Sequence, residues 1–269
     1  MQARSLAVSP GWRLVAAFNV LVLIFLVTPV IIVVLQAFNS GSFLTFPPEG
    51  FSTRWFVNFF TSRPFMDAFQ VSLLLAVYTV LISTVVGTAS ALVLVRQRFW
   101  GRDFLNLLFM SPLMLPALLT GLALFQYYLL LGWGRTFGGL LLGHVLVTTP
   151  YIIRTVSAVL HNFDRSLEEA AQNLGAGPLR TFFEVTLPII RPGIMAGAIF
   201  AFIVSYDQFP VSLFLVQAGF ETLPVYMFGY LKFAFDPTIA AASTVSIALS
   251  LIVVFLLERL FGLHNFARL

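Results

Sequence analysis

A carboxylic acid, Asp207, lies inside a long apolar run, with Tyr206 and Gln208 beside it. An ionisable side chain in such a run usually faces a bundle interior or a water-filled cavity, and it indicates a functional site. Pro210 has no N–H to donate to the carbonyl of Tyr206, so we expect a broken or kinked helix beside Asp207, as in helices that line ligand cavities. We therefore predict that these three residues contribute to a pathway for a cationic amine. The alternative is a structural carboxylate, protonated or paired with a neighbouring helix.

Three polar residues in other apolar runs are further candidates. Gln126 and Tyr127 could line the same pathway or belong to an interfacial aromatic belt, and the sequence leaves both interpretations open. His144 has no second ligand spaced near it, so we predict no metal site and expect it to form hydrogen bonds across helices.

Several kinds of chemistry are excluded by residue type. A phosphate-binding P-loop needs the pattern G-x-x-x-x-G-K-[ST], but the only lysine, Lys232, follows Leu231. No H-E-x-x-H or G-x-S-x-G pattern occurs, and the chain contains no cysteine for a thiolate site. We expect no cofactor and no catalysis in this chain, so any ATP and Mg²⁺ would bind to a separate polypeptide.

The composition determines the fold class. The chain has 269 residues, of which 59% are hydrophobic and only 10% charged, and its mean hydropathy is +0.95. Long continuous apolar runs, rather than short alternating segments, favour transmembrane helices over a barrel because each helix satisfies its own backbone. The sequence therefore predicts an all-α membrane protein.

Six spans are predicted in one transmembrane domain that covers residues 1–269. They run over about 13–38, 69–95, 104–130, 137–160, 188–216 and 238–260. The first is too long for the apolar core of a signal peptide, so we interpret it as a transmembrane helix. In the fifth, Gly193 and Gly197 form a G-x-x-x-G pair that permits close helix packing.

The basic residues predict the orientation. If both termini are cytoplasmic, most of the 15 Lys and Arg residues lie inside, as the positive-inside rule requires. Those left outside are Arg54, Arg63, Arg135 and Lys232. Because the basic residues are scattered over short loops, they indicate no nucleic-acid partner.

The loop between spans four and five, residues 161–187, contains strong helix signals. Ser166 followed by Glu169 fits a capping box, with Asp164 as a competing N-cap. A small apolar stripe follows, formed by Leu167, Ala170, Ala171 and Leu174. Gly175 can end this helix in the left-handed conformation, and Pro178 suits the first turn of a second helix. We expect Pro188 to end that helix or to begin span five.

The same loop resembles the EAA loop of ABC-importer permeases. The resemblance rests on Glu169-Ala170-Ala171, Gly175, Val185 and Leu187-Pro188, with Val185 where the family usually has Ile. In that family the loop is a coupling helix that enters a cleft of the ATPase subunit. The resemblance implies an ATPase-coupling role for a set that includes flanking residues, namely Glu168, Glu169, Ala170, Ala171, Leu174, Gly175 and Pro188.

Elsewhere the chain is most similar to the second permease of spermidine/putrescine importers. The similarity includes Met110–Pro112, His144–Pro150 and Glu221–Pro224. It implies a type I permease bundle in a bacterial inner membrane, with a homologous second permease, an ATPase dimer and a soluble binding protein as partners. The expected substrate is a small amine such as spermidine or putrescine; an opine or phosphonate is the alternative. A secondary transporter without an ATPase is less favoured, because the sequence shows no internal repeat.

Overall fold

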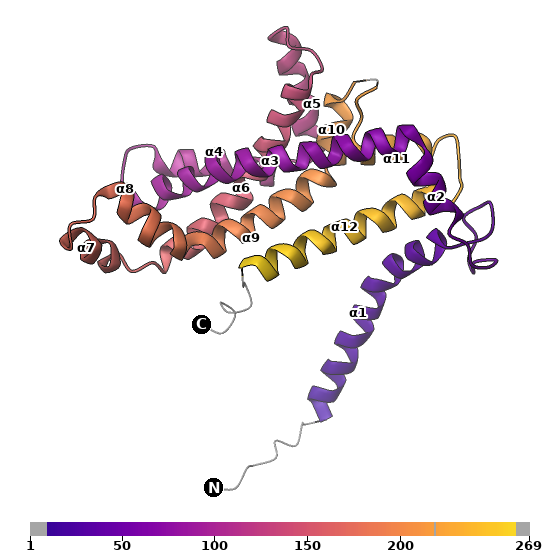
Figure 1. Cartoon of the computed structure of the whole chain (residues 1–269), viewed down its shortest axis with the longest axis horizontal. Coiled ribbons are helices and arrows are strands. Elements are labelled where there is room, and N and C mark those ends of the chain that lie inside the picture. Colours follow the sequence, from indigo (N-terminus) through magenta and orange to yellow (C-terminus); the bar gives the residue numbers. More distant parts are fainter. Residues whose placement is uncertain (1–9, 218, 262–269) are drawn as a thin grey trace. The chain divides into compact units, whose positions relative to one another are not determined.

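The structure of the protein, a computed structural model, describes residues 10–217 and 219–261. Its helices are labelled as in Figure 1: α1 (Pro10–Ala37), α2 (Arg54–Thr61), α3 (Arg63–Arg96), α4 (Arg102–Met114), α5 (Ala117–Leu130), α6 (Phe137–His161), α7 (Ser166–Asn173), α8 (Pro178–Thr181), α9 (Leu187–Tyr206), α10 (Phe209–Leu215), α11 (Leu223–Tyr230) and α12 (Thr238–Phe261). A π-helical turn, η1 (Phe182–Thr186), joins α8 to α9. Extended pairing in these residues is limited to isolated bridges, so the all-α prediction is confirmed.

The described residues form two compact units. Unit 1 comprises residues 10–62 and 231–248, and unit 2 comprises 63–217, 219–230 and 249–261. Helix α12 contributes to both units. The division therefore leaves the predicted single domain untested.

In unit 1, short side chains and aromatic rings form a small core. Ala37 of α1 and Ala241 of α12 are fully buried, and Trp55 and Phe56 of α2 pack against them. The indole N–H of Trp55 also donates to the carbonyl of Asn39 over 2.8 Å. These contacts hold the segment after α1 onto its own unit.

In unit 2, helices α3, α6 and α9 pack together around glycines. A Cβ atom on Gly87 of α3 would lie 2.6 Å from the side chain of Ile152. One on Gly197 of α9 would lie 2.5 Å from the hydroxyl of Thr155, and one on Gly193 would lie 2.8 Å from the Thr155 carbonyl. The predicted close approach at Gly193 and Gly197 is confirmed, and its partner is α6.

The predicted spans match the helices with two differences. The described residues contain five helices long and apolar enough to cross a membrane, or six if α4 and α5 count as one span. We predicted one helix over residues 104–130, but α4 and α5 meet at an angle of 110°. Pro116 causes this break, because it forces Leu115 into an extended conformation (φ −88°, ψ 144°).

The fifth span also differs from its prediction. We expected it to begin near Pro188, but one helical segment runs from Pro178 to Tyr206. In η1 the N–H of Leu187 donates to the carbonyl of Phe182, five residues earlier. Where the π-helical pattern changes back to the α-helical one, some backbone groups have no partner within the helix. Pro188 lies at this change, so its missing N–H does not cost a helical hydrogen bond. The helix therefore continues through this proline.

Candidate functional site

The coupling segment, which we define as residues 164–188, lies at one end of unit 2 (Figure 1). Its helix α7 begins at Ser166, whose N–H donates to a carboxylate oxygen of Asp164 over 2.9 Å. This hydrogen bond, with a second from the Ser166 side chain, lowers the pKa of Asp164. The predicted capping box was wrong, because Arg165 holds the N-cap position without a side-chain bond and Ser166 is already helical. Asp164, the competing residue, makes the hydrogen bond instead.

Gly175 ends α7 as predicted. Its φ is +91°, in the left-handed region. The N–H of Ala176 donates to the carbonyl of Ala171, and that of Gly175 donates to Gln172. These two bonds form a Schellman motif, which satisfies the last carbonyls of the helix.

Most of the predicted coupling residues are exposed. Leu174 is 90% exposed. Glu169, Ala170, Gly175 and Pro188 are also exposed, while Ala171 is half-buried. The segment thus presents an apolar and acidic surface that nothing in the described chain covers.

Glu168 behaves differently from these neighbours. Its side chain is 15% exposed and forms an ion pair with Arg96 at 2.7 Å. It also accepts a hydrogen bond from Thr186. Its carboxylate points into unit 2, so Glu168 does not belong with the exposed coupling residues. The sequence alone did not show this contact, because Arg96 precedes Glu168 by 72 residues.

The second candidate site is the break between α9 and α10, confirmed where it was predicted. Helix α9 ends at Tyr206, Asp207 and Gln208 leave the helical conformation, and Pro210 lies in the first turn of α10. The side chain of Asp207 is exposed and Gln208 is half-buried. Tyr206 is only 3% exposed, so it packs in the core instead of presenting its ring to a pathway. Its ring stacks on Phe202, with centroids 6.0 Å apart.

His144 holds the two sides of this break. The imidazole is fully buried, and its Nδ1 and Nε2 atoms each lie 2.9 Å from a serine hydroxyl, Ser205 of α9 and Ser212 of α10. The prediction of hydrogen bonding across helices is confirmed. The hydrogen bonds of His144 therefore attach the residues on both sides of Asp207 to α6.

The other predicted pathway residues lie on α5. Gln126 and Tyr127 are exposed, and α5 packs against α10. A Cβ atom on Gly121 of α5 would lie 2.9 Å from the carbonyl of Pro210. No hydrogen bond within the described chain joins Gln126 or Tyr127 to Asp207, so their role stays a prediction.

A cavity of about 370 Å³ in unit 2 was not predicted. Its lining includes Asp67 of α3 and Phe220, Glu221 and Tyr226 from the segment around α11. Burial, and then the nearby carboxylate of Glu221, raise the pKa of the Tyr226 hydroxyl. Asp67 already has a partner, Arg63, at 3.8 Å. The sequence could have indicated this ion pair, because Asp67 lies one helical turn after Arg63.

Comparison with known proteins identifies the family. Residues 83–263 match the family described as "Binding-protein-dependent transport system inner membrane component". This chain belongs to that family. It is the permease subunit of an ABC importer, a multi-pass membrane protein.

Two relatives from Escherichia coli K12 extend over most of this permease. It is 36% identical to the putrescine transport system permease protein PotI, over 87% of this chain and 84% of that protein. It is 30% identical to the spermidine/putrescine transport system permease protein PotC, over 91% and 92%. Among solved structures, a bacterial ABC transporter for alginate import aligns with a TM-score of 0.73 at 17% identity, over 93% of this chain and 94% of that one. This structural likeness supports the fold alone.

Proposed function

We propose that this permease forms half of the translocation pathway for a small cationic amine, such as putrescine or spermidine. The observation that carries the proposal is the 36% identity to a putrescine permease over 87% of this chain. The exposed carboxylate at the α9–α10 break supports it, because a carboxylate attracts an ammonium group. An opine or phosphonate importer is the alternative.

The proposed assembly has four kinds of component. A soluble binding protein delivers the amine from outside, and a homologous second permease supplies the other half of the pathway. A separate dimer of ATPase subunits binds ATP and Mg²⁺, while this chain is non-catalytic. Both termini lie on the cytoplasmic side of a bacterial inner membrane, which the basic residues support.

Docking on the ATPase is assigned to the exposed face of α7. An isolated helix of 8 residues is not stable in water, so it needs a surface to pack on. Leu174 at 90% exposure offers apolar area for such a surface. Glu169, Ala170 and Gly175 lie on the same exposed segment.

The substrate proposal is tested by transport in vesicles that contain the complete importer. Replacing Asp207 with Asn removes the charge at nearly constant volume. A hydrogen bond to a charged group contributes about 1.5–3 kcal/mol, so we expect uptake of labelled putrescine or spermidine to need about 10- to 100-fold more substrate for half-saturation. The initial uptake rate is measured in two titrations. One varies the concentration of the substrate-loaded binding protein, and the other varies the concentration of free amine.

Asp103→Asn is the matched control, since Asp103 is also exposed but lies in the first turn of α4. It should leave uptake unchanged. Wild-type affinity and rate in Asp207→Asn would show that Asp207 takes no part in amine transport. Tight binding of an opine or aminophosphonate by the cognate binding protein, with no amine binding, would overturn the substrate class.

A further inference from the structure

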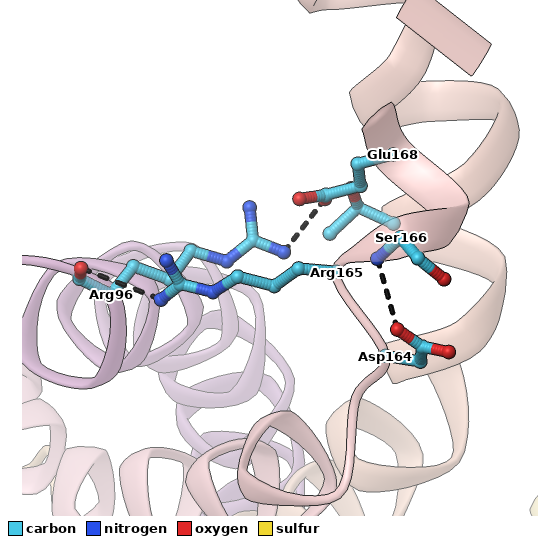
Figure 2. Close-up of polar contacts among 6 residues, drawn as sticks. Arg96, Asp164, Arg165, Ser166 and Glu168 are labelled. Carbon is cyan, nitrogen blue, oxygen red and sulfur yellow. Dashed lines mark hydrogen bonds and ion pairs between the residues drawn. The ribbon is translucent and has the colours of Figure 1, made fainter. Parts of the chain in front are cut away.

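One carboxylate, that of Glu168, joins three separate elements of unit 2. Its Oε1 atom accepts a hydrogen bond from the guanidinium of Arg96, at the end of α3, over 2.7 Å. The same atom accepts a hydrogen bond from the hydroxyl of Thr186 in η1, which leads directly into α9. Figure 2 shows Arg96 reaching from its helix to Glu168 on α7. We call these three residues the Glu168 joint.

The Glu168 joint is more shielded from water than the ion pair between Arg180 and Glu184 in the same segment. The side chains of Arg96 and Glu168 are 23% and 15% exposed, whereas those of Arg180 and Glu184 are 69% and 60% exposed. Exposed pairs are screened by water and contribute little, but a shielded pair with extra hydrogen bonds resists separation. Thr186 is itself only 1% exposed. The Glu168 joint therefore resists separation of α7 from α3 and η1.

Arg96 is held on its other side as well. Its guanidinium lies 5.3 Å from the ring centroid of Phe163. Its backbone carbonyl accepts a hydrogen bond from Arg165 over 3.5 Å, drawn in Figure 2. The end of α3 thus contacts the residues on both sides of the turn that enters α7.

Two short turns also join α7 to its neighbours in the chain. Gly175 and Gly177 separate it from α8, and a hydrogen bond at Asp164 precedes it. A force applied to α7 through such turns alone would be absorbed by rotation of the glycine backbone. The Glu168 joint bypasses these turns, because it links α7 directly to α3 and to the start of α9.

We propose that Glu168 is a positioning residue that transmits movement of α7 to α3 and α9. This role rests on the proposed docking of α7 on an ATPase. Helix α9 leads to the break at Asp207, and α3 packs on both α6 and α9. A displacement of α7 therefore reaches the pathway along two helices at once.

The test compares Glu168→Gln and Arg96→Gln in the complete reconstituted importer. Each variant removes one charge of the joint and leaves the exposed face of α7 intact. We expect the ATPase subunits to co-purify in normal amount and ATP hydrolysis to persist. The number of substrate molecules transported per ATP hydrolysed should fall about tenfold, as expected when a shielded ion pair worth about 1.4 kcal/mol or more is lost. The double variant should lose no more than either single one, because both remove the same contact.

Thr186→Val and Glu184→Gln complete the comparison. Thr186→Val keeps the side-chain shape and removes the hydroxyl donor. It should lower the transport ratio, the number of substrate molecules transported per ATP hydrolysed, by less than Glu168→Gln does. Glu184→Gln breaks the exposed pair with Arg180 in the same segment and should leave the ratio unchanged.

Two results would overturn the proposal. An unchanged transport ratio in assembled Glu168→Gln and Arg96→Gln complexes would show that the joint transmits nothing. Loss of ATPase co-purification in Glu168→Gln would assign Glu168 to docking instead. A failure of wild-type chain to retain any ATPase subunit is a different result, which removes the proposed docking itself.

Discussion

The imidazole of His144 has a defined pattern of hydrogen bonds because one partner is already committed. Ser212 donates its hydroxyl proton to the carbonyl of Gln208, so its oxygen accepts from the Nε2–H of His144. In the neutral imidazole Nδ1 then accepts from the hydroxyl of Ser205. One side chain of α6 thus ties α9 to α10 across the interruption that contains Asp207.

Replacing His144 with Leu should destabilise the permease. The substitution removes both cross-helix hydrogen bonds from a fully buried site, at a cost of about 1–3 kcal/mol. The midpoint of thermal unfolding in detergent should fall. His161→Leu is the control, because His161 is exposed in the last turn of the same helix. Equal midpoints for the two variants would contradict the bridging role.

At the scale of elements, α7 owes its ends to local chemistry and its position to distant contacts. Asp164 accepts a hydrogen bond from the N–H of Ser166, the first residue of the helix, and Gly175 ends the helix with a φ of +91°. The Glu168 joint then fixes the helix on unit 2. The exposed face therefore has a set direction before any partner binds, which would lower the cost of ordering the segment in the proposed docking.

Gly175→Ser and Gly177→Ser test whether the C-terminal end of α7 is needed for ATPase docking. At Gly175 a side chain meets no neighbour within 4 Å, so the expected harm comes only from the left-handed backbone, about 1–2 kcal/mol. Gly177 has a φ of −70°, which serine adopts freely, and serine is a good N-cap residue for α8. Affinity for the ATPase subunit, measured by titration, should fall about fivefold or more for Gly175→Ser and stay near wild type for Gly177→Ser. The reverse order would argue against α7 as the docking helix.

At the scale of the whole molecule, unit 2 depends on helices whose backbones approach closely. Within a membrane, apolar burial gives little preference for one neighbour, so packing of small residues selects the partner. Gly87, Gly193 and Gly197 bring α3 and α9 onto α6. These three helices therefore form one closely packed group.

Gly197→Ala and Gly138→Ala should change stability in opposite directions. A Cβ on Gly197 would lie 2.9 Å from the backbone Cα of Ile152, so overpacking should cost about 1–3 kcal/mol. Gly138 of α6 has no neighbour within 4 Å, and alanine there should stabilise by about 0.5–1 kcal/mol. Unfolding midpoints of the two variants in the same detergent would show the signs. A stabilising Gly197→Ala would contradict the close approach of α9 and α6.

The sequence by itself determined the features that depend on local chemistry. Apolar run lengths predicted the helices, Gly175 and Pro178 predicted the turns of the coupling segment, and Pro210 predicted the break beside Asp207. Each is a property of one backbone segment, so neighbouring residues suffice to specify it. Pro116 carried the same kind of signal, and the 110° bend shows that its effect was underestimated.

Only the tertiary structure decided which side chains meet. Hydropathy places His144 and Ser205 within spans, but it does not indicate which helix each one faces. Likewise, Glu168 and Glu169 are adjacent and chemically alike in the sequence, yet one pairs with Arg96 and the other is exposed. Adjacent positions on a helix point about 100° apart, so the packing of α7 on unit 2 directs the carboxylate of Glu168 into the bundle and leaves that of Glu169 exposed.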